Sequence, residues 1–226
     1  KPAILLASDV GLTVKGDKLP YVSRGGLKLE KAIAAFGLTF EGKTCMDVGS
    51  STGGFTDCML QKGAQKVYAV DVGYGLLDWK LRNDPRVVVM ERTNARLLNP
   101  EMTGGERMDF ASMDVSFISI RTVLPAVRTC MKENAHLAVL VKPQFEARRE
   151  QVGKGGIVRD PKVHREVLET VIAAMPAIGL VPQGLTVSPI KGVGGNTEFL
   201  LHLTNTELND AAFQAERAIE DVLRFV

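Results

Sequence analysis

The stretch KTCMDVGSSTGGF, residues 43–55, joins a short apolar run to a glycine-rich segment, and it decides the fold class. The apolar run over residues 43–49 predicts a buried strand, and the segment over residues 55–63 predicts a helix. Glycines between a strand and a helix allow a tight turn beside the amide groups that open the helix, where a ligand can approach the backbone. The stretch therefore predicts a ligand-binding loop in an α/β protein.

The rest of the chain repeats this alternation of short apolar runs and helix-length segments. Such alternation is typical of a doubly wound α/β fold, with a mostly parallel sheet and helices on both faces. We expect a Rossmann-like sheet of seven strands within one domain over residues 21–226. The other strands are predicted at residues 66–72, 86–90, 108–115, 135–141, 184–189 and 197–203, and the other helices at residues 27–36, 120–132, 164–179 and 208–225.

Composition describes an ordinary globular protein, with 226 residues of which 45% are hydrophobic and 24% are charged. No apolar run reaches the roughly 18 to 20 residues of a membrane-spanning helix, and no signal peptide opens the sequence. We therefore expect a cytoplasmic protein without a membrane partner. A net charge of +2 is too small to indicate a polyanionic partner by itself.

Cysteines and histidines give no sign of a metal site. Cys45, Cys58 and Cys130 lack the CxxC spacing and are expected to be reduced core residues. The three histidines, at positions 136, 164 and 202, lack the spacing of metal ligands. We predict that the protein holds no metal.

The glycine-rich loop itself restricts the ligand. An NTPase phosphate loop requires a lysine where Phe55 stands, and the dinucleotide fingerprint G-x-G-x-x-G is broken because the second glycine is displaced. Asp47 precedes the glycines and favours a cationic ligand, because a carboxylate would repel a pyrophosphate. S-adenosylmethionine fits this loop, since it carries an ammonium and a sulfonium and no phosphate.

Polar residues follow the next two strands as well. Asp71 ends the second strand, where a carboxylate can accept both ribose hydroxyls, and Asn94 follows the third, where an amide can read the adenine edge. A turn cap at Asp47 and a solvated strand end at Asp71 would explain either residue alone. Their register with three successive strands favours a cofactor. The residues expected to contact it are Asp47, Gly49, Ser51, Thr52, Gly53, Gly54, Phe55, Asp71, Asn94 and Asp114.

Charged residues also end the fourth and fifth strands. Asp114 follows one, and Lys142 follows the other in AHLAVLVKPQFE, residues 135–146. Glu198 opens the last strand and Lys28 lies in the helix before the first, so we expect all four to converge on one cleft. A lysine can remove the proton of a ribose hydroxyl if its pKa is lowered from about 10.4 to about 7 or 8. A buried ion-pair network, or lysines that extend to solvent, explains the same spacing equally well.

Basic residues cluster on either side of this expected cleft. They can contact a phosphate backbone, although a solvated face is the alternative. They are Arg24, Lys31, Arg148, Arg149, Lys154 and Arg159, and the family resemblance of the segments quoted below implies that they bind RNA.

Two aromatic residues follow the second predicted strand. Tyr74 and Trp79 could flank an adenine, but packing against the second helix is favoured for Trp79.

Several segments together resemble a known family. YVSRGGLKLEKA, MDVGSSTGGFTDCMLQKGAQKVYAVDVGYG, DVSFIS, VKPQFE, GGIVRDPKVH and GGNTEF are similar to the methyltransferase domain of the TlyA family, which is itself similar to the FtsJ (RrmJ) ribose methyltransferases. The resemblance runs from about residue 21 to about residue 203. It implies an S-adenosylmethionine-dependent 2′-O-methyltransferase that acts on cytidines of ribosomal RNA in ribosomal subunits.

The resemblance also assigns roles to residues. The family's Lys-Asp-Lys-Glu tetrad carries over to Lys28, Asp114, Lys142 and Glu198, with Lys142 as the base. Residues 1–20 would be a linker and the remnant of a truncated N-terminal RNA-binding module, so this chain is expected to methylate ribosomal substrates poorly. The loop departs from the FtsJ pattern, because residues 50–52 are Ser-Ser-Thr in place of Ala-Ala-Pro.

Two other functions stay open at this point. Proteins with this resemblance have been labelled haemolysins, which would mean a membrane-active protein. A catalytically inactive RNA-binding assembly factor, with the cofactor as a structural ligand, is the other alternative.

Overall fold

A computed structural model describes residues 19–206 and 213–226. The expected linker and module remnant therefore lie almost wholly outside the described residues, as does the beginning of the helix predicted at residues 208–225.

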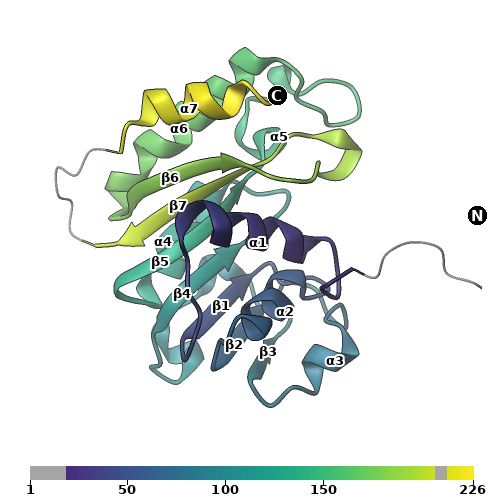
Figure 1. Cartoon of the computed structure of the whole chain (residues 1–226), viewed down its shortest axis with the longest axis vertical. Helices are drawn as coiled ribbons and strands as arrows, with labels where there is room; N and C mark the ends of the chain where they lie inside the picture. Colours follow the sequence, from purple (N-terminus) through teal and green to yellow (C-terminus); the bar gives the residue numbers. More distant parts are fainter. Residues whose placement is uncertain (1–18, 207–212) are drawn as a thin grey trace, which may run out of the picture.

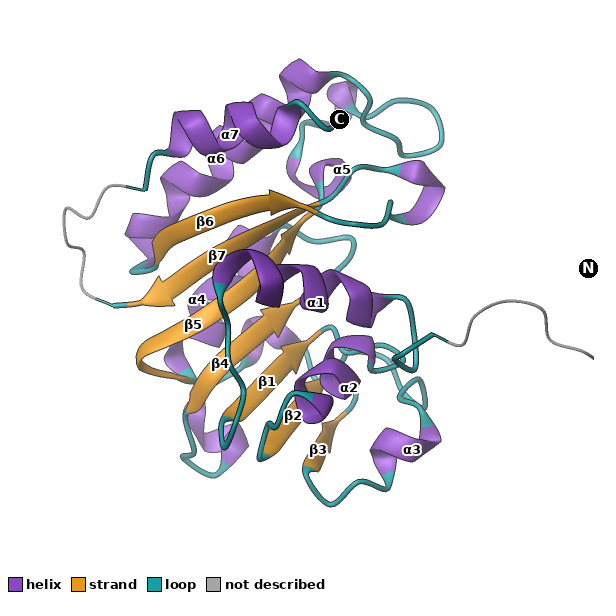
Figure 2. Ribbon diagram, viewed as in Figure 1, coloured by secondary structure: helices purple, strands orange, loops and turns teal. Residues whose placement is uncertain are grey.

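A seven-stranded sheet forms the centre of the protein, in the order β3-β2-β1-β4-β5-β7-β6 (Figures 1 and 2). The first five strands pair in parallel, whereas β7 runs antiparallel to both of its neighbours. The strand order changes direction at β1, which is the point where ligands bind in open α/β sheets. The prediction of a mostly parallel sheet of seven strands is confirmed. The strands are β1 Thr44–Val48, β2 Lys66–Val70, β3 Val87–Met90, β4 Met108–Met113, β5 Met131–Val141, β6 Val181–Val187 and β7 Phe199–Asn205.

Helices cover both faces of the sheet (Figure 2). Successive residues of β5 point to opposite faces, so Leu140 packs with α1 and α2 while Val139 packs with α4, α6 and α7. Two apolar cores result, one on each face. The helices are α1 Gly25–Phe36, α2 Gly54–Gln61, α3 Trp79–Arg82, α4 Ile120–Thr129, α5 Pro143–Glu146, α6 Pro161–Ile178 and α7 Ala215–Leu223, with 3-10 turns η1 Ala95–Leu97, η2 Pro100–Thr103, η3 Arg149–Gln151 and η4 Val193–Gly195.

Local sequence explains where several helices begin and end. Gly37 ends α1 in the left-handed conformation, at φ 64°, and the Asp160 side chain caps α6 just before a proline in its first turn. The predicted helix over residues 120–132 is too long, because Met131 already pairs with Met108 as the first residue of β5. Sheet pairing overrides the local helical pattern there.

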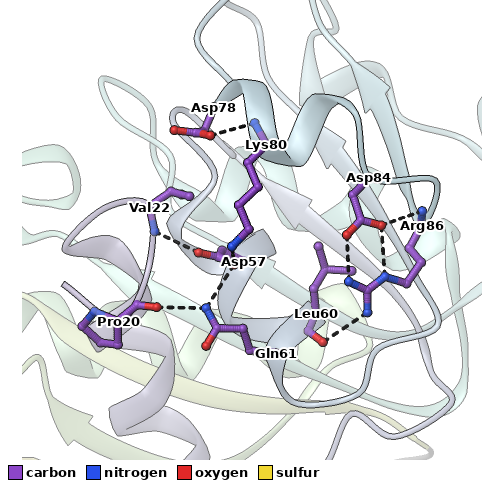
Figure 3. Close-up of polar contacts among 9 residues, drawn as sticks. All are labelled: Pro20, Val22, Asp57, Leu60, Gln61, Asp78, Lys80, Asp84 and Arg86. Atoms are coloured by element: carbon purple, nitrogen blue, oxygen red, sulfur yellow. Dashed lines mark hydrogen bonds and ion pairs between the residues drawn. The ribbon is translucent and has the colours of Figure 1, made fainter. Parts of the chain in front are cut away.

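The segment that leads into α1 is fastened to α2 (Figure 3). The backbone amide of Val22 donates to Asp57 Oδ2 at 2.9 Å, and Gln61 Nε2 donates to Asp57 Oδ1 at 3.1 Å. Asp57 is 2% exposed and also pairs with Lys80 at 3.4 Å. These contacts fix the start of α1, the helix that carries Lys28, beside the glycine-rich loop.

Candidate active site

Four charged side chains line one cavity of about 360 Å³ at the carboxyl ends of β1, β4 and β5. Lys28 Nζ lies 2.7 Å from Glu198 Oε2 and 3.3 Å from Asp114 Oδ2. Lys142 Nζ lies 2.5 Å from Asp114 Oδ1, so Asp114 bridges the two amines. The structure thus brings together all four residues that the sequence placed in one cleft, from α1 and from the ends of β4, β5 and the turn before β7.

The two lysines of this set have different surroundings. Burial disfavours the charge of Lys28, but the attraction of Asp114 and Glu198 outweighs it and holds the pKa of Lys28 above its ordinary value. Lys28 is therefore fixed as an ammonium by two carboxylates. Lys142 contacts one carboxylate, and its Nζ donates to the neutral Ser116 Oγ at 2.9 Å.

Backbone geometry explains why a core strand ends on a lysine. The eleven residues of β5 end at Val141, and Pro143 then occupies the first turn of the short helix α5. A proline cannot donate to a strand ladder but fits the first turn of a helix. The chain therefore turns at Lys142 and leaves its side chain at the sheet edge.

The glycine-rich loop brings parts of the protein's own chain together. Gly49 has φ 83°, and a Cβ atom there would lie 2.5 Å from the carbonyl oxygen of Asp114. At Gly53 a Cβ atom would collide with Leu81, and at Gly54 with Ser23 Oγ. Protein atoms therefore fill the space beside these two α-carbons, and Gly54 also lines the first cavity. Contact of Gly53 and Gly54 with a cofactor stays a prediction.

Two further loop residues also serve packing. Phe55 is 4% exposed and belongs to the core beneath α1 and α2, and Thr52 accepts a hydrogen bond from the Asp78 amide through its carbonyl oxygen at 3.2 Å.

Asp47 is buried and stabilises the glycine-rich loop through hydrogen bonds. It is 1% exposed, and its Oδ2 accepts hydrogen bonds from Thr56 N at 2.9 Å and Thr56 Oγ1 at 2.7 Å. Its Oδ1 accepts from Ser112 Oγ at 3.0 Å. Burial raises the pKa of Asp47 to about 6, although these hydrogen bonds oppose the shift. The carboxylate joins the end of β1 to α2 and β4 through contacts within the chain.

The raised pKa of Asp47 predicts a pH-dependent stability. Between the ordinary pKa of 3.8 and about 6, the folded protein binds more protons at this site than the unfolded chain. The free energy of unfolding therefore falls as pH rises through this window, by about 3 kcal/mol at most from this group. Asp47→Asn keeps the size and the acceptor but cannot ionise. The stability of wild type relative to Asp47→Asn, from urea unfolding, should fall between pH 4 and pH 7; parallel stability curves would contradict this account.

A second cavity of about 570 Å³ adjoins the first and shares Gly49, Ser51, Asp114 and Ser116 with it. Its walls include apolar side chains and two polar residues from the sequence prediction, Asp71 and Asn94. This volume lies within the usual range for small-molecule sites.

Both polar residues of the second cavity also stabilise turns. Asp71 Oδ2 accepts from the Ser51 amide at 2.8 Å and Oδ1 from the Gly73 amide at 2.7 Å, whereas Asn94 Oδ1 accepts from the Arg96 amide at 3.1 Å. A carboxylate oxygen has a second lone pair, so Asp71 can still accept from a ligand hydroxyl. Apolar walls and polar acceptors together suit a nucleoside, and the residues present fit the expected cofactor.

Two aromatic residues that the sequence offered as neighbours of the adenine, Tyr74 and Trp79, are exposed and do not line the second cavity. The prediction that Trp79 packs against the second helix is wrong, since its side chain is 76% exposed. Tyr74 is 68% exposed, and the guanidinium of Arg92 stacks 4.3 Å from the centre of its ring.

The predicted RNA-binding residues are all exposed, but they occupy different places. Arg24 lines the first cavity, whereas Lys31 does not. The loop with Lys154 is joined to the turn before Glu198 by the buried Asn196, whose side chain accepts from the amide of Val158 at 3.0 Å and donates to the carbonyl of Gly156 at 2.9 Å.

Sequence reasoning missed several cavity residues, among them Ser116 and Lys191. Ser116, two positions after Asp114, contacts Lys142, and its place in the segment DVSFIS was the available signal. Lys191 also lines the first cavity, where its Nζ donates to Thr197 Oγ1 at 2.7 Å.

Within the described residues, no helix is long and apolar enough to cross a membrane. The same part of the chain has no cluster of three or more His, Cys, Asp or Glu side chains that could hold a metal ion. The three cysteines are buried and free, as predicted.

Comparison with known proteins supports one class of function. The family model of FtsJ-like methyltransferases matches residues 21–205. YqxC of Bacillus subtilis is 57% identical over 203 residues, which are 90% of this chain and 72% of that protein. The 16S/23S rRNA (cytidine-2′-O)-methyltransferase TlyA of Mycobacterium tuberculosis is 46% identical over 99% of this chain and 82% of its own length. A solved structure of a hemolysin-named protein from Streptococcus thermophilus has a TM-score of 0.86 at 50% identity, covering 93% of this chain and 77% of that one.

Proposed function

Because the chain belongs to the FtsJ-like methyltransferase family, we propose that it transfers the methyl group of S-adenosylmethionine to a ribose 2′-hydroxyl of ribosomal RNA, with a cytidine as the target. The observation that carries the proposal is the meeting of two amines and two carboxylates in a cavity that opens beside a second, nucleoside-sized one. The reaction needs both spaces, one for the nucleotide that is modified and one for the methyl donor.

Lys142 acts as the base in this proposal. A ribose hydroxyl must lose its proton as its oxygen attacks, and a neutral amine can accept that proton. Lys28 is unsuited to this step, because Asp114 and Glu198 hold it as an ammonium. Its charge lies next to Asp114 and offsets part of that residue's attraction for the Lys142 proton. Lys28, Asp114 and Glu198 therefore position Lys142 and set the charge around it.

The residues of the second cavity would hold the methyl donor. Asp71 can accept ribose hydroxyls, Asn94 can contact the adenine edge, and Gly49 and Ser51 border both cavities. Asp47 supports this loop from below through Thr56 and Ser112. When bound, S-adenosylmethionine supplies an electrophilic methyl group on a sulfonium.

Ribosomal RNA or a ribosomal subunit is the proposed partner, and the cytoplasm is the proposed location. Residues 21–226 form the catalytic domain in this account. Six exposed cations, of which Arg24 lines the first cavity, would contact the phosphate backbone, so affinity should fall as salt rises. They are Arg24, Lys31, Arg148, Arg149, Lys154 and Arg159.

Methyl transfer to purified ribosomal subunits tests the proposed function. Labelled S-adenosylmethionine is incubated with the full-length protein and with subunits that lack the modification, and label is counted in the RNA. Incorporation above a protein-free control is expected. Cofactor binding without incorporation would favour an assembly factor, and leakage of liposomes at the same protein concentration would favour a membrane-active protein; either result without transfer would refute the proposal.

A further inference from the structure

We propose that Ser116 is a positioning residue that orients the amine of Lys142 toward the hydroxyl that is methylated. This inference rests on the proposed function, in which Lys142 is the base. Ser116 itself exchanges no proton with the substrate. Its hydroxyl oxygen accepts a hydrogen bond from Lys142 Nζ at 2.9 Å, and the residue lines both cavities.

The geometry of an amine explains the proposed role. A neutral lysine amine has two N–H groups and one lone pair in tetrahedral arrangement around the nitrogen. Asp114 Oδ1, at 2.5 Å, and Ser116 Oγ, at 2.9 Å, offer acceptors for the two N–H groups. With both N–H groups directed at these acceptors, the lone pair of the nitrogen points in one fixed direction. Without Ser116 the amine could rotate about its terminal carbon–nitrogen bond and turn the lone pair away from the substrate.

Ser116 also suits this role because it is neutral. A second carboxylate would hold the amine as an ammonium, as Asp114 and Glu198 hold Lys28. A hydroxyl fixes the direction of the amine with a smaller preference for the charged form. This difference separates Lys142 from Lys28.

The side chain of Glu146 holds in place the loop that carries Ser116. Glu146 follows Lys142 by four residues, and its side chain is 1% exposed. It accepts hydrogen bonds from Ser119 Oγ and from the Ile120 amide, each at 2.7 Å. Between Ser116 and Ser119, Phe117 adopts φ 63°, which is uncommon for a residue with a side chain. The segment after Lys142 thus fixes the loop that presents Ser116 to Lys142.

The proton balance of the step is simple. As the oxygen–carbon bond forms, the sulfur–carbon bond breaks and S-adenosylhomocysteine leaves. The 2′-hydroxyl proton moves to Lys142 Nζ, which then donates to Asp114, to Ser116 and to solvent. Release of this proton to solvent restores the neutral amine.

Kinetics of three variants on ribosomal subunits test the inference. Ser116→Ala should lower kcat about 10- to 100-fold and leave KM for both substrates within about twofold. The loss should persist at every pH at which the wild type is active. Ser116→Thr keeps the hydroxyl and should recover most of the rate.

Ser119→Ala is the matched control, because it weakens the loop contact with Glu146 and leaves the Ser116 hydroxyl in place. An equal loss of kcat in Ser119→Ala and Ser116→Ala would mean that loop order alone matters, and would overturn the inference. A rate of Ser116→Ala equal to that of wild type, or a rate that recovers fully at high pH, would also overturn it. Absence of transfer by wild type would instead refute the proposed function, so the two failures are distinguishable.

Discussion

Lys142→Ala is expected to lower kcat about 10²- to 10⁴-fold, the contribution usual for a positioned general base. The loss is expected because Lys142 is the proposed base. Among the described residues, its amine pairs with the carboxylate of Asp114 and with no second carboxylate, whereas the amine of Lys28 pairs with two. Lys142 does not line the second cavity, which is proposed to hold the cofactor, so the Kd for S-adenosylmethionine should change less than about threefold. Single-turnover methyl transfer and calorimetric cofactor titration measure the two quantities separately.

Lys132→Ala provides the matched control for this variant. Lys132 lies on the same strand, β5, near its opposite end, and pairs with Asp109 at 2.7 Å with 49% of its side chain exposed. Its removal should leave kcat within about twofold, because exposed pairs contribute little. Comparable transfer by Lys142→Ala and Lys132→Ala would exclude Lys142 as the base.

Asp114→Asn should reduce both activity and stability. The carboxylate bridges the two lysines, and its loss takes the ion-pair partner from Lys142 while Lys28 keeps Glu198. Breaking a buried ion pair by removing one partner costs about 3 kcal/mol at neutral pH. We expect the free energy of unfolding to fall by about this amount and kcat to fall at least about 10²-fold, since the amine of Lys142 loses its closest contact.

A double variant identifies the cause of this defect. Lys142→Met removes the charge that Asp114→Asn leaves without its carboxylate partner, so the stability deficit of Asp114→Asn should be smaller in the Lys142→Met background. Asp109→Asn is the control, because Asp109 pairs with the half-exposed Lys132 on the neighbouring strand; about 1 kcal/mol is expected there. Urea unfolding at pH 7 gives the comparison, and an equal deficit of Asp114→Asn in both backgrounds would argue against the charge explanation.

The sheet could be predicted because the strands have recognisable local sequence patterns. Residues 66–70 or 87–90 are apolar runs bounded by turn residues, and their alternation with helices specifies a parallel sheet. The same logic placed Asp114 and Lys142 at one edge, since parallel strands end together. The start of β5 at Met131 could not be predicted this way, because it depends on pairing with Met108.

The finer parts of the site depend on contacts between distant residues. Nothing around Glu146 alone indicates that it holds Ser119 and Ile120, 27 and 26 residues away. Asn196 likewise joins the loop at residue 156 only through tertiary structure. Gly53 and Gly54 are a third example, because the glycine pattern does not show that Leu81 and Ser23 pack closely against these two residues.

The chemical position of the transferred methyl group tests the central claim most directly. Ribosomal RNA labelled by the full-length protein is digested to nucleosides, and the nucleosides are identified by mass spectrometry. The account predicts that the methyl group resides on the ribose of a cytidine, as 2′-O-methylcytidine, because the amine of Lys142 is placed to remove a hydroxyl proton. A methyl group on a base would contradict it.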